Sequence, residues 1–96
     1  MGKAVAKTPA RVGNNVLVKT VLPFYTGRIV SISKEEIVLE RAAWIADTGR
    51  FSEALARGRD ALNEVEIVPP GKRVAVQRGA IISILDWHGD LPEATK

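Results

Sequence analysis

Alternating apolar and polar positions run through the first half of the chain and predict β-strands. A valine-rich alternation over residues 15–22 ends at Pro23, which marks the end of a first strand. Two further β-rich segments, over residues 27–32 and 36–42, are separated by only a short polar turn. We therefore expect these two segments to pair as a hairpin.

The second segment of this hairpin is expected to have two unlike faces. Successive side chains of a strand point to opposite sides, so residues two apart share a face. On this rule Ile37 and Leu39 lie on the core face, and the opposite, mixed face holds Val38, Glu40 and Ala42.

The pattern changes at "RFSEALARG", residues 50–58, which predicts a helix of one to two turns. Ser52 is the expected N-cap, with Phe51 before it as a hydrophobic staple. Glu53 falls in the first turn, and Gly58 stands where a helix commonly ends.

Strand patterns return in the second half of the chain. A strand over residues 64–68 leads into "PPGK", a sequence typical of a type II turn with Gly71 in its positive-φ position. A strand over 73–77 then meets Arg78-Gly79, and a last strand covers 80–86. Gly79 is expected to allow a backbone bend that a Cβ would forbid, with Arg78 projecting from the rim.

Five or six short strands with one helical turn predict a mainly β fold. Closing such a sheet into a small, strongly bent five-stranded barrel would remove most open edges, and neighbouring copies could cover the remainder. We expect a single barrel domain over residues 14–87 with the short helix inserted between strands. A flexible arm, residues 1–13, precedes it and a tail, residues 88–96, follows it.

The net charge of +3 comes entirely from the expected arm. Its Lys3, Lys7 and Arg11 are three of the 14 basic side chains, whereas all 11 acidic ones lie in residues 14–96 and are matched there by 11 basic ones. Two interpretations stay open: a tether that attracts phosphate, or a solubilising segment without a partner.

Composition narrows the class of protein further. There is no cysteine, so a disulfide framework and a thiolate metal site are excluded, in keeping with a cytoplasmic protein. No apolar run is long enough to cross a membrane, and no signal peptide is recognisable.

The sequence offers few parts for catalysis. His88 is the single histidine, so one subunit can build neither a histidine-pair metal site nor a Ser-His relay. We predict no enzyme activity, no cofactor and no metal. Trp44, Trp87 and Tyr25 are the aromatic side chains on which a nucleic-acid base could stack. For the two tryptophans, a place in the core or in a subunit interface is favoured over base stacking. Ion pairs with nearby acids are expected for Arg28, Arg41, Arg50, Arg57 and Arg59.

Two segments resemble the Sm and Sm-like (Hfq-type) family. "VQRGAIISI" is similar to the second Sm motif, with Arg78 and Gly79 between the last two strands. "TGRIVSISKEEIVLERA" is similar to the first motif, with Gly27 opening the second strand. Ser33 and Glu36 depart from the Asp and Asn usual in that motif. The longer segment over 43–72 resembles the elaboration of small phage-encoded members.

The resemblance implies a bent barrel that assembles into a homo-oligomeric ring and binds RNA or single-stranded nucleic acid. The residues implied at the nucleic-acid site are Arg78, Gly79, Lys34, Glu36, Lys3, Lys7 and Arg11. Glu36 would repel phosphate and cannot offer an amide donor. The alternatives are an SH3-like or OB-like barrel, and a structural or adaptor oligomer without nucleic-acid binding.

Overall fold

The computed structural model describes residues 8–96 and shows six strands, one α-helix and two 3-10 turns. In chain order the elements are β1 (Asn15–Thr20), β2 (Phe24–Ile32), β3 (Glu36–Asp47), α1 (Phe51–Arg57), η1 (Gly58–Ala61), β4 (Glu64–Ile67), β5 (Val74–Gln77), η2 (Arg78–Ala80) and β6 (Ile81–Asp86).

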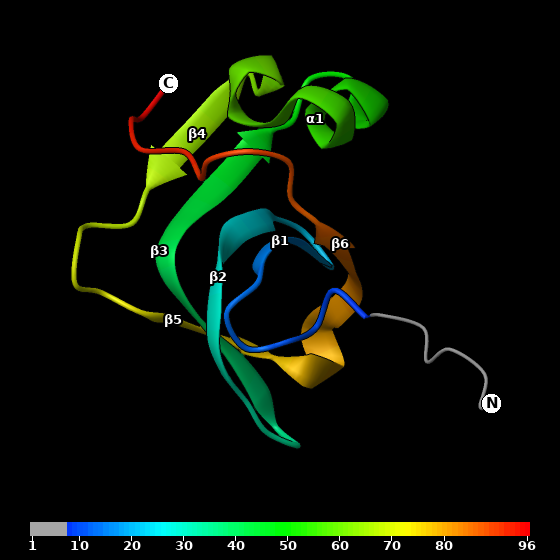
Figure 1. Cartoon of the computed structure of the whole chain (residues 1–96), viewed down its shortest axis with the longest axis vertical. Coiled ribbons are helices and arrows are strands. Elements are labelled where there is room, and N and C mark those ends of the chain that lie inside the picture. Colours follow the sequence, from blue (N-terminus) through cyan, green and yellow to red (C-terminus); the bar gives the residue numbers. More distant parts are fainter. Residues whose placement is uncertain (1–7) are drawn as a thin grey trace, which may run out of the picture.

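All pairings in the sheet are antiparallel. The strand order is β4-β3-β2-β1-β6, and β5 also pairs with β3 (Figure 1). The expected mainly β fold with one short helix is therefore confirmed, and so is the hairpin of β2 and β3. Closure into a five-stranded barrel is not confirmed, because the described strands number six and form a sheet whose ends do not pair.

The 12-residue strand β3 is the longest element, and two different strands pair with it along one edge. Residues 36–39 pair with β5, whereas residues 43–47 pair with β4. Between these halves Arg41 has a φ of 50°. Opposite it, the pairing with β2 slips between Thr26 and Arg28, so that two residues of β3 face Gly27 alone. This is a β-bulge, which bends a strand and increases its twist.

The bulge changes which residues of β3 share a face. Ile37 and Leu39 are buried together as expected, but Ala42 joins them rather than lying opposite. Ala43 and Ile45 instead enter a separate core. The expectation for Ala42 was wrong because strict alternation fails at the extra residue.

Two hydrophobic cores lie on the two sides of β1. Val16 and Val18 belong to the core enclosed by the bent sheet, and the intervening Leu17 belongs to the core beneath α1 and the C-terminal segment. All three side chains are fully buried. A strand buried on both faces reads as a nearly continuous apolar run, as this one does.

Several predicted boundaries shift. The first strand ends at Thr20, because Thr20 turns to bond Pro23 through both its N–H and its hydroxyl, which places Val21 and Leu22 in the turn. The helix begins at Phe51, and Arg50 is its N-cap with no side-chain cap bond, so Ser52 is not the cap. The Ala54 N–H already bonds the Arg50 carbonyl, which starts the helix earlier than predicted.

Two glycine predictions are confirmed. Lys72 N–H donates to the Pro69 carbonyl at 3.1 Å and Gly71 has a φ of 84°, as a type II turn requires. Gly58 follows α1 with a φ of 77°, and a Cβ there would collide with the carbonyl oxygen of His88.

The predicted tail is packed onto the molecule. Leu91 and Pro92 are buried, and the tail runs alongside β4 (Figure 1). Within residues 8–96, no helix has the length and apolar character needed to span a membrane.

Candidate functional site

The β2–β3 turn lies at the far end of the molecule from α1 (Figure 1) and is held by Ser33. The Ser33 hydroxyl accepts from the backbone N–H groups of Glu35 and Glu36, at 3.3 and 3.1 Å. The Ser33 N–H donates to the Glu36 carbonyl at 2.9 Å. These bonds fix a tight turn that leaves Lys34 exposed at its tip.

The η2 turn packs against this hairpin turn through Arg78. Its backbone N–H donates to the Glu35 carbonyl at 2.8 Å, and its Nη1 donates to the Ser33 carbonyl at 3.0 Å. The Gln77 side-chain amide donates to Glu36 Oε1 at 3.3 Å. The structure thus brings together four predicted site residues from segments more than 40 positions apart: Arg78, Gly79, Lys34 and Glu36.

Gly79 has a different role from the one predicted. Its φ lies outside the left-handed region, and a Cβ added to it would have no atom within 4 Å. The bend is instead made by the 3-10 conformation of η2, which any small residue can adopt. Gly79 is therefore exposed and unobstructed, so it leaves free space beside Arg78.

Charge at this site is balanced. Lys34 and Arg78 are the two cations, and Glu35 and Glu36 are the two anions beside them. Within the described chain neither cation forms an ion pair within 4.0 Å. The guanidinium of Arg78 uses one N–H to bond the Ser33 carbonyl, and its other N–H groups can donate to a phosphate or a carboxylate. The two neighbouring glutamates weaken the attraction of this site for such an anion.

The predicted basic arm lies only partly within the described residues, since Lys3 and Lys7 fall outside them. Arg11 sits in a turn that Gly13 and Asn14 attach to Ile29 of β2 by backbone hydrogen bonds. In the part of the chain from residue 8 onward, no hydrogen bond or ion pair joins Arg11 to Arg78 or Lys34.

Among the described residues, four of the five arginines expected to form ion pairs do so, but only Arg57 pairs with an acid close to it in sequence. Arg28 pairs with Glu40 at 3.7 Å and Arg57 with Glu53 at 4.0 Å. Arg59 pairs with Glu93 at 2.9 Å, and Arg41 also reaches Glu93, at 4.0 Å. These partners leave Arg50 as the one member of the predicted set without an ion pair in residues 8–96.

The two tryptophans differ. Trp87 is buried in the core beneath α1, and its Nε1–H donates to the Asp90 carbonyl at 3.0 Å. Trp44 is 47% exposed on β3 beside Tyr25 of β2. Trp44 is thus available for contact with another molecule, whereas Trp87 serves the fold.

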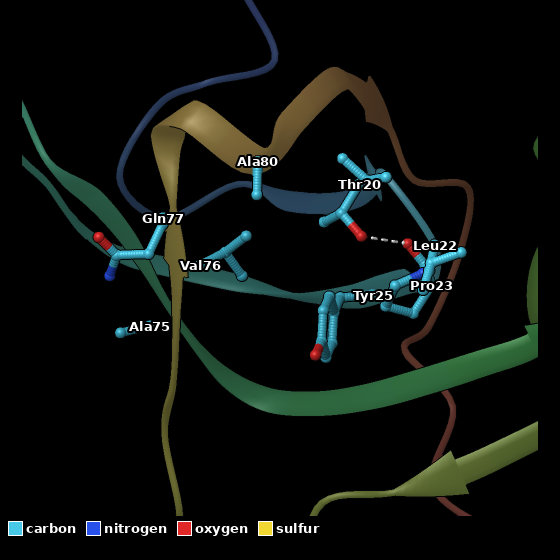
Figure 2. A pocket seen from close by; sticks show the side chains of 9 residues that line it. Thr20, Leu22, Pro23, Tyr25, Ala75, Val76, Gln77 and Ala80 are labelled. Carbon is cyan, nitrogen blue, oxygen red and sulfur yellow. Dashed lines mark hydrogen bonds between the residues drawn. The ribbon is translucent and has the colours of Figure 1, made fainter.

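Sequence reasoning missed an apolar surface at the β1–β2 turn. Leu22 is 86% exposed there and adjoins a hollow of about 350 Å³. Figure 2 shows Val76 and Gln77 of β5 on one side of this hollow and Leu22 and Pro23 on the other. The available signal was the Val-Leu pair directly before Pro23, because two adjacent side chains of a strand cannot both lie on its core face.

Two strands bordering this region have an open edge. Among residues 8–96, β5 pairs only with β3 and β6 pairs only with β1. On β6 the pairing with β1 slips at Ile82, whose side chain is 61% exposed. The open backbone edges and the exposed apolar side chains occur in the same part of the molecule.

Residues 8–96 contain no group of three or more histidine, aspartate or glutamate side chains placed to hold a metal ion. Comparisons with protein-family models, with curated proteins and with solved structures found no match to this chain.

Proposed function

We propose that this protein is a non-enzymatic assembly module of the Sm-like kind, whose copies join edge to edge into a ring. The observation that carries the proposal is the pair of open strand edges on β5 and β6. An open edge presents unpaired N–H and C=O groups to other chains. Because the two edges belong to different strands, each copy can offer one edge to the next, and such heterologous contacts form a ring when the rotation between copies closes on itself.

Exposed apolar side chains support the same surfaces. Ile82 protrudes from β6, and the hollow beside β5 is lined by uncharged residues that include Val21, Leu22 and Tyr25. Apolar groups in this arrangement favour contact with a second chain over solvent. The strongly bent, mainly β sheet is also compatible with the Sm-like or SH3-like barrel expected from the sequence.

The native mass of the protein, measured by light scattering and by native mass spectrometry, tests this proposal. We expect a single ring mass for the wild type and a shift to monomer for Ile82→Lys, since a lysine on an edge strand opposes pairing. Val12→Lys is the matched control, because Val12 is 64% exposed and lies before β1. A wild-type protein that stays monomeric would refute the assembly role.

A second proposed activity is weak binding of single-stranded RNA or DNA at the Arg78 site. It is supported by the hydrogen bonds that place Arg78 beside the Lys34 turn. The neighbouring acids limit the attraction, so phosphate contact would dominate and the affinity would fall steeply with salt.

Titration with polyuridine and polyadenine at low salt tests this second activity. We expect Arg78→Ala to weaken binding several-fold and Arg73→Ala, an exposed arginine on another part of the surface, to leave it unchanged. Thermal melts of both variants control for the lost bond to Ser33. Absence of binding by the wild type would leave a structural or adaptor oligomer without a nucleic-acid role.

A further inference from the structure

The outer edge of β4 is covered by residues 93–96 of the same chain. The N–H of Val65 donates to the Lys96 carbonyl at 3.2 Å, and the N–H of Lys96 donates to the Val65 carbonyl at 3.0 Å. The N–H of Ile67 donates to Thr95 Oγ1 at 3.2 Å. Residues 93–96, which we term the cover segment, thus take the place of a neighbouring strand.

Buried apolar side chains anchor the residues immediately before the cover segment but not the segment itself. Immediately before it, Leu91 is 1% exposed in the core beneath α1, and Trp87 bonds the Asp90 carbonyl. By contrast, all four residues of the cover segment are exposed. Lifting this segment would cost no burial of Leu91, so the segment can open while the rest of the tail stays in place.

Arg59 holds the beginning of this segment, whereas Lys96 holds its other end, where Nζ donates to the Leu62 carbonyl at 2.6 Å. Arg59 Nη1 donates to Glu93 Oε1 at 2.9 Å and to the Leu91 carbonyl at 3.3 Å, and its Nη2 lies 3.9 Å from Asp90 Oδ2. The hydrogen bond to Glu93 raises the pKa of Arg59 above its ordinary value. The partners are solvent-exposed, and exposed ion pairs are individually weak and screened by salt.

We propose that the cover segment is a releasable cap that closes the β4 edge to strand addition, and that the Arg59–Glu93 contact lowers how often it lifts. The inference rests on the proposed function in one respect, that open edges join copies of this chain. With the segment lifted, the N–H groups of Val65 and Ile67 would offer a third edge to a second copy.

Amide hydrogen exchange of the full chain, read residue by residue by NMR, tests the cap directly. We expect Arg59→Gln to speed exchange at Val65 and Ile67 about three- to tenfold while Leu17 stays protected. In the wild type, 0.5 M salt should have a similar effect, roughly that of losing one weak ion pair. Arg50→Gln, which removes an exposed arginine with no ion pair in residues 8–96, should change nothing.

Thr95→Val provides a narrower test, because it removes the acceptor of Ile67 alone. Exchange should then rise at Ile67 more than at Val65. The proposal would be overturned if Val65 and Ile67 exchanged no faster in Arg59→Gln, or at high salt, than they do in the wild type at low salt. A uniform rise across all strands would also overturn it, since that result indicates global unfolding.

Native mass distinguishes this inference from the proposed function. We expect Arg59→Gln to form species larger than the wild-type assembly as protein concentration rises. Faster exchange at β4 with an unchanged mass would refute strand addition at this edge. A monomeric wild type would refute the ring, and the exchange data would still decide whether the segment lifts.

Discussion

The outer edges of β4 and β5 offer the clearest comparison within this molecule. Both strands pair with the same side of β3, four residues each, yet one outer edge is covered and the other is open. The β4 edge is occupied by Thr95 and Lys96, and the β5 edge borders a hollow lined by uncharged side chains. Because β4 and β5 are equally short, strand length alone does not decide whether an outer edge is covered.

The cause of the difference lies in β3. The bulge at Arg41 bends the strand between its two halves, so β4 and β5 lie on one strand but in different surroundings. The half near β4 lies in the core beneath α1 and the C-terminal segment, whereas Ile37 and Leu39 in the half near β5 lie in the core enclosed by the bent sheet.

The largest effect should come from breaking the anchor of the covered edge. Leu91→Ala removes a side chain that is 1% exposed, and we expect a loss of about 3 kcal/mol in the free energy of unfolding. Leu22→Ala is the control, since the same deletion at an 86% exposed position should cost less than about 0.5 kcal/mol. Urea unfolding monitored by circular dichroism measures both. Similar costs at the two positions would contradict the packing of the tail.

A smaller effect is expected where the helical region meets the tail. Gly58→Ala places a Cβ against the His88 carbonyl in a left-handed conformation, and we expect a loss of about 2 kcal/mol. Gly71→Ala also has a positive φ, of 84°, but it lies in a type II turn with no atom within 4 Å of the new Cβ, so about 1 kcal/mol is expected. Thermal denaturation measures both losses, and equal losses would contradict the close approach of Gly58 to the His88 carbonyl.

The smallest effect should be a gain in stability at the bulge between the two halves of β3. Arg41 holds a φ of 50°, which is unfavourable for any residue with a Cβ. Arg41→Gly should therefore stabilise the fold by about 1 kcal/mol, despite losing the exposed contact with Glu93. Arg28→Gly, in ordinary strand geometry, should instead be destabilising by roughly 0.5–1 kcal/mol. If Arg41→Gly lowered the free energy of unfolding, the contacts of the arginine side chain would stabilise the fold by more than its unfavourable φ destabilises it.

Short sequence patterns correctly predicted the turns and the end of the helix. The polar turn before Glu36 gave the hairpin, and Gly58 and Gly71 marked the end of a helix and a type II turn. The extension of β3 to Asp47 and the phase change at Arg41 were not predicted, because β3 itself has no glycine or proline at the bulge and the glycine opposite it, Gly27, lies on β2. The packing of Leu91 was also missed, since an isolated apolar residue in a polar tail has no periodicity to reveal it.

The candidate site was predicted in part. The resemblance to Sm motifs placed Arg78 and Lys34 in one site, and the hydrogen bonds to Ser33 and Glu35 bring these segments together. Gly79 was given the wrong role, because a glycine in the sequence does not reveal its φ. The open edges and the exposed Leu22 depend on which strands pair over long distances, and alternation within one strand carries no information on that choice.

The burial of β1 on both sides has a consequence for how this chain loses its structure. Val16 and Val18 support one core and Leu17 supports the other, so their shared backbone cannot leave one core and remain in the other. Denaturation should thus be all-or-none, with methyl signals from both cores disappearing at the same urea concentration. Despite its two separate interiors, the protein should melt as a single cooperative unit.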